Sequence, residues 1–222
     1  MNKLKGFLIA TISILTLFAA PPVIAAELNE PQRVLQETSD LLYEIIQKDK
    51  DRLSDRNFVF GLVNDIIEPR VDLNKISRLI LGKHWRKASD EQKTQFQKEF
   101  KNLLVNTYAT AFKEFDEWTI HFLPMSLETT DKRVIVKTQI VMPSRPPIAV
   151  NYRMAKSKTG NWKAYDVIIE GISMVTNYKS SFSKSIKRSG GLDNVIKELA
   201  DKNNKTEEAT KKLASETITD NS

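Results

Sequence analysis

Few side chains in this chain could support catalysis or metal binding. Its 222 residues contain two histidines, His84 and His121, and no cysteine. Neither histidine stands at a spacing from another ligand residue that is typical of a metal site. The absence of cysteine excludes disulfide bonds, thiolate catalysis and a lipoprotein anchor, because the acylated residue of such an anchor is a cysteine. The sequence therefore gives no positive indication of metal or thiol chemistry, and we expect no cofactor.

Two carboxylates have surroundings in which a general base could arise. Asp166 follows Trp162 and Tyr165 in an apolar run, and Glu170 directly precedes Gly171. A carboxylate on a half-buried strand can act as a base, but it is more often a structural acid paired with a neighbour. No G-x-S-x-G motif accompanies these acids. An isomerase-like enzyme for a hydrophobic substrate, with Asp166 as its acid, stays open as an alternative function.

The segment from Pro69 to Phe115 is expected to organise the fold. Its first part is a short apolar helix that ends at Gly82. The basic connector Lys83–Lys87 follows, which could lie at a ligand entrance, on a partner surface or in a solvated turn. Ser89 and Gln92 then form the capping-box pattern of a long helix. Apolar residues behind this cap recur at spacings of three and four, which places them on one face: Phe96, Phe100, Leu103, Leu104, Tyr108, Ala111, Phe112 and Phe115.

After Trp118 the apolar period changes from helical to alternating, and we expect the long helix to lie on the resulting sheet. The alternation covers Trp118–Phe122, Arg133–Met142, Ile148–Met154 and Trp162–Ile169. Four strands with short connections predict an antiparallel sheet. Further helical periodicity covers residues 31–46, 55–67, 175–188 and 192–199. The sequence therefore predicts an α+β fold, with several helices packed on a curved four-stranded antiparallel sheet.

The two ends of the chain differ from this domain of residues 27–200. Residues 1–26 combine Lys3 and Lys5, an apolar run and small residues at Ala25-Ala26, the pattern of a cleaved signal peptide. Residues 201–222 are polar, and we expect a disordered tail or a fraying helix there. The net charge is +6, or +4 without the two lysines of the signal segment. This mild charge and the export signal indicate a periplasmic protein that binds no nucleic acid.

The remaining observation is a surplus of apolar and aromatic residues on the long helix and the strands. A filled core, as in a structural or adaptor protein, would account for it. The other interpretation is a hollow between the helix and the sheet, lined by Tyr108, Phe112, Tyr152, Tyr165 and their neighbours. Concave apolar hollows with a few hydroxyl groups suit amphipathic ligands.

Several short motifs occur in an order that resembles one known family. They are Leu81-Gly82, Trp85–Ser89, Glu91-Gln92, Gly160–Val167, Glu170–Met174 and Gly190–Asp193. With the export signal and the lack of cysteine, residues 31–199 resemble the MlaC family, also called the toluene-tolerance (Ttg2 auxiliary) family. The resemblance implies an NTF2-like cone with a hydrophobic pocket that binds phospholipid, and it implies no catalytic residues.

The resemblance also implies a transport role. The protein would be the auxiliary component of an MCE-type ABC transport system, shuttle phospholipid between the outer and inner membranes and so support outer-membrane lipid asymmetry. Its partners would be an inner-membrane MCE-domain ABC transporter complex and an outer-membrane lipoprotein–porin complex, and we expect a monomer. The lipid tails would insert between the long helix and the sheet. The residues expected to bind them are Leu104, Tyr108, Phe112, Val136, Tyr152, Tyr165, Val167 and Met174.

Overall fold

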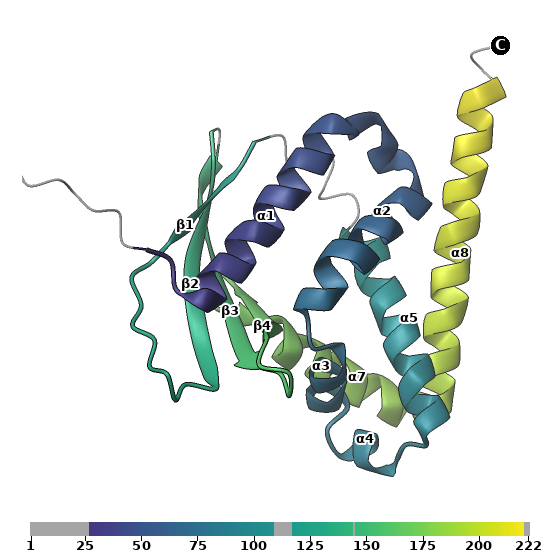
Figure 1. Cartoon of the computed structure of the whole chain (residues 1–222). Helices are drawn as coiled ribbons and strands as arrows, with labels where there is room; N and C mark the ends of the chain where they lie inside the picture. Colours follow the sequence, from purple (N-terminus) through teal and green to yellow (C-terminus); the bar gives the residue numbers. More distant parts are fainter. Residues whose placement is uncertain (1–26, 109–116, 144, 220–222) are drawn as a thin grey trace, which may run out of the picture.

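The computed structural model describes residues 27–108, 117–143 and 145–219. Its α-helices are α1 (Glu30–Lys48), α2 (Arg56–Leu62), α3 (Leu73–Leu81), α4 (Lys83–Lys87), α5 (Asp90–Tyr108), α7 (Met174–Ser189) and α8 (Leu192–Thr219). The short helical turns are η1 (Lys50–Ser54), η2 (Val63–Ile67) and η3 (Glu68–Arg70). The strands β1 (Thr119–Phe122), β2 (Arg133–Met142), β3 (Arg145–Lys156), β4 (Trp162–Ile169) and β5 (Ile172–Ser173) form a sheet in that order (Figure 1).

The predicted α+β class and antiparallel sheet are confirmed, but the number of strands differs. Every neighbouring pair of strands is antiparallel, and the sheet has five strands. The additional strand is β5, which lies outside the alternating segments of the sequence analysis. Glu170 and Gly171 have φ angles of 48° and 82°, and this tight turn folds Ile172 back onto Ile169. A left-handed backbone is easy for glycine and uncommon for other residues, so the turn is a local feature that alternation does not reveal.

An irregularity between β3 and β4 decides which side chains share a face. Arg153 pairs with Asp166 and Met154 pairs with Ala164, so Tyr165 is an extra residue in β4. Such a bulge interrupts the strict alternation of a strand. Cross-strand partners lie on the same face of a sheet, and the sequence analysis had no means of placing this bulge.

Helix α1 covers the sheet face that carries Val136 and Met154. Both residues are fully buried, and Val34 and Leu35 of α1 pack against their cluster. Figure 1 shows α1 lying across the strands. The helix begins with a capping box in which the side chain of Gln32 accepts a hydrogen bond from the backbone amide of Asn29 at 2.9 Å. Local capping and a tertiary apolar stripe therefore define the same helix.

The aromatic face of α5 packs mainly on other helices, which corrects the expectation that it lies on the sheet. The capping box is present, because Ser89 N donates to Gln92 Oε1 at 2.9 Å and Gln92 N donates to Ser89 Oγ at 3.1 Å. Phe96 and Phe100 are at most 1% exposed and share a cluster with Phe182 of α7 and with residues of α8. The centroids of the Phe96 and Phe182 rings lie 5.2 Å apart, edge to face. The stripe was correctly identified from Phe96 to Leu104, while Ala111, Phe112 and Phe115 lie outside the described residues. Periodicity does not show which elements such a stripe packs against.

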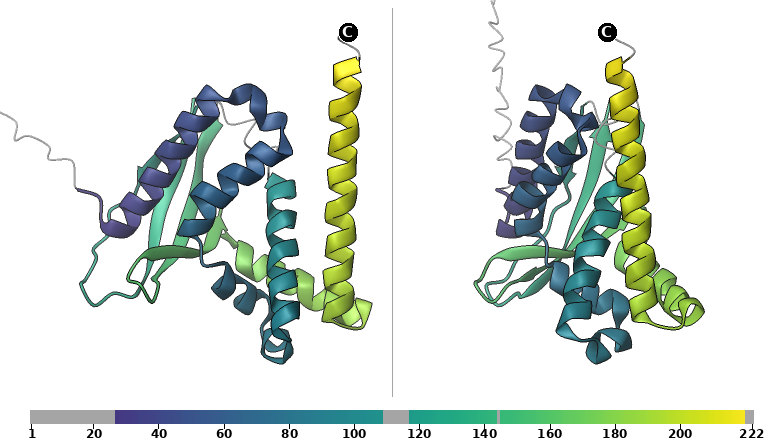
Figure 2. Two further views of the ribbon diagram at one scale, coloured as in Figure 1. Left: turned by 45° about the vertical axis from the view of Figure 1, so that its right-hand side comes forward. Right: turned by 90° about the vertical axis from the view of Figure 1, so that its right-hand side faces the viewer.

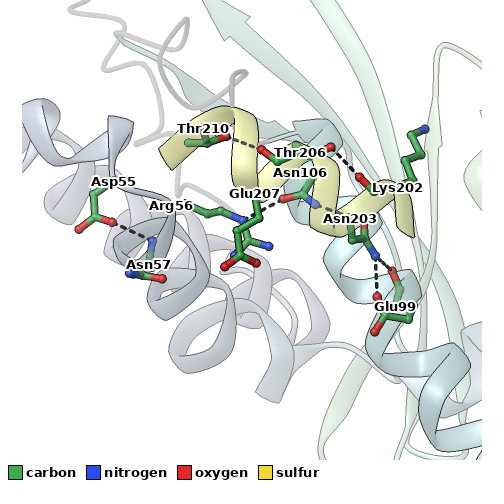
Figure 3. A network of polar contacts seen from close by, with 10 residues as sticks. All are labelled: Asp55, Arg56, Asn57, Glu99, Asn106, Lys202, Asn203, Thr206, Glu207 and Thr210. Atoms are coloured by element: carbon green, nitrogen blue, oxygen red, sulfur yellow. Dashed lines mark hydrogen bonds and ion pairs between the residues drawn. The ribbon is translucent and has the colours of Figure 1, made fainter. Parts of the chain in front are cut away.

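Helix α8 continues through the segment that the sequence predicts to be a polar tail. It lies beside α5 and extends past it (Figure 2). Asn203 is 3% exposed, and its Nδ2 atom donates to the backbone oxygen of Glu99 at 3.0 Å and to Glu99 Oε2 at 2.8 Å. Asn106 Nδ2 donates to Asn203 Oδ1 at 3.2 Å (Figure 3). These bonds attach the polar part of α8 to α5.

The same network reaches α2. Arg56 Nε donates to Asn106 Oδ1 at 3.3 Å, and Arg56 Nη1 lies 3.2 Å from Glu207 Oε2 of α8 (Figure 3). Polar partners thus connect this segment, for which the sequence left a disordered tail or a fraying helix open, to α5 and α2. Composition does not show which polar groups meet across the fold. Within the described part of the chain, no helix is both long and apolar enough to span a bilayer. The predicted signal segment, residues 1–26, lies outside that part.

Candidate functional site

An apolar cavity of about 340 Å³ lies between α5 and β4. Pockets for small ligands typically measure about 300–1,000 Å³, so this cavity is in the lower part of that range. Its walls come from η2, η3, α3, α5, β4 and α7, together with Val71. The lining residues are Val63, Ile67, Glu68, Val71, Leu73, Ile76, Ile80, Phe100, Lys101, Leu104, Val105, Tyr108, Ala164, Asp166, Val167, Ile169, Met174, Val175 and Tyr178.

Backbone and capping bonds join α3 to β4 at this cavity. Val71 forms a parallel bridge with Ala164, and the amide of Asp72 donates to the carbonyl of Ala164 at 2.9 Å. Asp72 Oδ1 also accepts from the amide of Lys75 at 2.9 Å, which caps the start of α3. Leu73 and Ile76 of this helix then line the cavity. The α3 wall of the cavity is therefore attached to the sheet by backbone hydrogen bonds.

Asp166 is the buried acid of the cavity, and its contacts are structural. Its side chain is 1% exposed, and its Oδ2 atom accepts from Arg153 Nη1 at 3.0 Å and from Ser173 Oγ at 2.7 Å. Its Oδ1 atom accepts from the amide of Val175 at 3.0 Å. Ser173 Oγ in turn accepts from the amide of Thr176 as the N-cap of α7. Both carboxylate oxygens thus attach the start of α7 to β4, which favours the structural interpretation of this acid over a general base.

Two tyrosines bring hydroxyl groups to the apolar wall. Burial raises the pKa of the Tyr178 hydroxyl well above its ordinary value, and a side-chain hydrogen bond with Tyr108 raises it further. The hydroxyl of Tyr178 therefore stays neutral at physiological pH. Tyr108 is 40% exposed, so it lies where the cavity meets solvent.

The cavity lining also contains an ion pair. Lys101 Nζ of α5 lies 3.0 Å from Glu68 Oε2 of η3, and it donates to Asn64 Oδ1 at 3.1 Å. The side chains of Lys101 and Glu68 are 26% and 43% exposed. These charges therefore stand at the margin of the cavity, where water still reaches them.

The structure brings four of the predicted ligand-binding residues to the cavity and places three elsewhere. Leu104, Tyr108, Val167 and Met174 line it. Val136 and Tyr152 are paired across strands and share the sheet face of Val167, but both belong to the cluster beneath α1. The ring of Tyr165 has Lys75 Nζ at 3.8 Å from its centroid and is not part of the cavity wall. Phe112 lies outside the described residues.

Much of the wall comes from residues that the sequence analysis assigned only to helix cores. Val63 and Ile67 belong to η2, which is one turn of π-helix. A π-helical turn shifts the phase of a helical stripe, so 3.6-residue periodicity does not predict the direction of these side chains. Only their apolar character in the stripe of residues 55–67 was a usable signal.

The basic connector Lys83–Lys87 forms α4 and does not line the cavity. Its Trp85 is buried in the cluster of α5, α7 and α8. The ligand-entrance interpretation of this connector is therefore not supported, while a partner surface and a solvated connection both stay open. Across the described ranges, no group of three or more His, Asp or Glu side chains is arranged to hold a metal ion.

Comparison with known proteins identifies the family of this chain. A family model described as MlaC protein matches residues 36–201, well over half of the 222-residue chain. The chain belongs to the MlaC family. The resemblance inferred from the sequence motifs is thereby confirmed.

Individual relatives of this MlaC-family chain agree with that assignment. The toluene tolerance protein Ttg2D of Pseudomonas putida is 30% identical over 186 residues, which cover 82% of this chain and 86% of the relative. The intermembrane phospholipid transport system binding protein MlaC of Haemophilus influenzae is 27% identical over 199 residues, which cover 88% and 91% of the two chains. A phospholipid-binding protein of Ralstonia solanacearum, solved in complex with a phospholipid, is 30% identical. It matches with a TM-score of 0.75 over 80% of this chain and 99% of its own.

Proposed function

We propose that this protein is a periplasmic phospholipid carrier. The observation that carries the proposal is the apolar cavity between α5 and β4, in a chain of the MlaC family. A related structure, 30% identical to this chain, contains a phospholipid. The proposed contacts for the acyl tails are Leu104, Tyr108, Val167 and Met174, with the helical residues Val63 and Ile76 on the facing walls.

The energetics of lipid transfer explain why such a cavity is needed. Each methylene exposed to water costs about 0.8 kcal/mol, so a chain of roughly sixteen carbons costs on the order of 10 kcal/mol to hydrate. An apolar wall that replaces water around the tail removes most of this cost. Met174 suits the task because a flexible thioether adapts to tails of different shape.

The proposal extends to the transport system in which the carrier would act. The names of the relatives, an intermembrane transport binding protein and a toluene tolerance protein, support a carrier within a transport system. We propose that an inner-membrane MCE-domain ABC transporter complex and an outer-membrane lipoprotein–porin complex exchange lipid with this chain. Directional transfer would take its energy from the transporter. The alternative of an isomerase-like enzyme would rely on Asp166, and the three hydrogen bonds to that carboxylate give it no support.

Mass spectrometry tests the proposal directly. The mature protein, purified from cells, is measured under native conditions and again after organic extraction. We expect stoichiometric phospholipid, and the extracted protein should take up lipid again from vesicles. A protein that carries no lipid after purification and takes none from vesicles would falsify the carrier function.

A matched pair of variants ties the binding to this cavity. Leu104→Trp fills part of the cavity from α5, and Thr107→Trp places the same ring on an exposed position of the same helix. We expect Leu104→Trp to lower lipid uptake roughly tenfold, because steric overlap of even 1.4 kcal/mol changes occupancy by that factor. Thr107→Trp should bind lipid like the original protein. Equal uptake by both variants would move the site elsewhere.

A further inference from the structure

We propose that Lys101 and Glu68 form a headgroup subsite for zwitterionic phospholipids at the margin of the cavity. In this arrangement Lys101 binds the lipid phosphate, and Glu68 accepts from the ammonium group of the same headgroup. The inference rests on the proposed carrier function and extends it to lipid selectivity.

The charged residues at the cavity differ in how far their side chains are already engaged. Among the described residues, those that line it with a charged side chain are Glu68, Lys101 and Asp166. The Asp166 side chain is 1% exposed and is engaged by Arg153, Ser173 and Val175. In the described part of this wall, the charges available to a ligand are therefore those of Lys101 and Glu68.

The side chains of Lys101 and Glu68 lie where the cavity meets water. The tails of a phospholipid enter the apolar space, but its charged headgroup must stay where water or charged partners compensate it. Lys101 and Glu68 are 26% and 43% exposed, so they lie at such a boundary. Two large hydrophobic residues of the lining, Tyr108 and Ile169, are also exposed, but they carry no charge. Electrostatics therefore favours the headgroup beside the ion pair.

The bonds of Lys101 leave it a donor hydrogen for a further partner. Its Nζ atom donates to Glu68 Oε2 at 3.0 Å and to Asn64 Oδ1 at 3.1 Å. An ammonium group has three donor hydrogens, so one remains for a further acceptor. A partly exposed ion pair is weakly held because water competes for both charges. A phosphate oxygen can thus bind Lys101 with little rearrangement of the protein.

The sign of both charges selects the class of lipid. A zwitterionic headgroup places a phosphate and an ammonium group a few bonds apart, which matches a lysine and a glutamate in contact. An anionic lipid without an ammonium group would bring its phosphate to Lys101 but would meet the Glu68 carboxylate uncompensated. A diacylglycerol would leave both protein charges without a lipid partner.

Competitive loading tests this selectivity. The extracted mature protein is incubated with vesicles that contain equal amounts of phosphatidylethanolamine, phosphatidylglycerol and diacylglycerol with the same acyl chains, and bound lipids are quantified by mass spectrometry. We expect phosphatidylethanolamine to exceed phosphatidylglycerol, and diacylglycerol to be least abundant. Glu68→Gln should raise bound phosphatidylglycerol relative to phosphatidylethanolamine several-fold. Lys101→Gln should lower both phospholipids relative to diacylglycerol by roughly tenfold, the effect of losing one charge-assisted hydrogen bond.

Lys98→Gln is the matched control, because Lys98 is exposed on the same helix and does not line the cavity. It should keep the original selectivity, and Lys101→Arg should keep the preference for phosphate. The proposal is overturned if the unsubstituted protein shows no preference for phosphatidylethanolamine over phosphatidylglycerol, a result that needs no variant to fold. It is also overturned if both Gln variants bind lipid with unchanged ratios, and the carrier function then still stands. Failure of the unsubstituted protein to take up any lipid overturns the carrier function itself.

Discussion

Single buried polar groups join neighbouring elements of the fold. Asp166 connects β4 to the start of α7 through three hydrogen bonds. Thr138 is fully buried, and its hydroxyl donates to the carbonyl of Val150 within the sheet. Because each of these groups has a partner, its burial does not carry the cost of an unpaired polar atom. These hydrogen bonds thus stabilise the attachment of α7 to β4 and of β2 to β3.

Tyr152 should make the stability of the protein depend on pH. Burial raises its pKa from 10.0 to about 12. A group whose pKa is higher in the folded state contributes stability that is present below its unfolded pKa and lost as the pH rises toward the folded value. We therefore expect the free energy of unfolding to fall as the pH rises between about 10 and about 12.

Urea unfolding across this range is the measurement, and Tyr152→Phe is the diagnostic variant. Phenylalanine cannot ionise, so the variant should show a smaller loss of stability over the same interval. Tyr178 also has a raised pKa and contributes in the same direction, so some dependence should remain. An identical pH profile for the variant and the original protein would contradict the assignment to Tyr152.

At the scale of elements, polar contacts rather than apolar ones hold the middle of α8. Its first turns bury Val195, Ile196 and Leu199 in the main helical cluster. Farther along, Asn203 and Glu207 contact α5 and α2 (Figure 3). Since α5 and the η2 turn that follows α2 both line the cavity, α8 connects two of its walls from outside.

Asn203→Ala should loosen this connection. It removes a side chain that is 3% exposed, together with its hydrogen bonds to Glu99 and the bond that it accepts from Asn106 Nδ2. Such a loss costs roughly 1–3 kcal/mol. We expect lower resistance to urea and faster amide hydrogen exchange in residues 201–210.

Lys202→Ala provides the comparison, because Lys202 is exposed on the neighbouring position of the same helix. Its stability and exchange should match those of the original protein. Equal exchange rates in Asn203→Ala and Lys202→Ala would show that the polar network does not hold α8 in place.

At the scale of the whole molecule, two packed groups meet around the cavity. One group is the sheet with α1, whose core contains Val136, Met154 and Trp162. The other is the bundle of α3, α5, α7 and α8 (Figures 1 and 2). Its core contains Phe96 and Phe100. The cavity takes residues from both groups. Apolar walls that are not packed against one another lose dispersion contacts, and a bound lipid tail would restore them.

Lipid removal should therefore destabilise the protein. A ligand that binds only the folded state adds roughly 2.7 kcal/mol at a hundred times its dissociation constant. We expect the extracted protein to melt at a lower temperature than the loaded one and to recover when vesicles are added. Differential scanning calorimetry measures this. A melting temperature that is the same with and without lipid would argue against binding in this cavity.

The amino-acid sequence by itself determined the class of the fold, the limits of most elements and the family. Capping residues such as Ser89 and Gln92 and the apolar period around Phe96 and Phe100 are local signals, and the structure has the predicted helix there. The change to alternation after Trp118 is equally local, and it correctly placed an antiparallel sheet. Local periodicity is enough for these features because neighbouring residues alone define a helix face or a strand face.

Only the tertiary structure decided which faces meet and where space remains. The bulge at Tyr165 and the π-helical turn at Val63–Ile67 shift side chains relative to ideal repeats, and each shift changes which residues reach the cavity. The partners of Asn203 are residues 99 and 106, about a hundred positions away in the chain. Such contacts depend on how distant elements pack, and periodicity along the chain contains no information about that packing. For this reason the sequence predicted a hollow beside the long helix, whereas the residues of its helical walls became visible only in the folded protein.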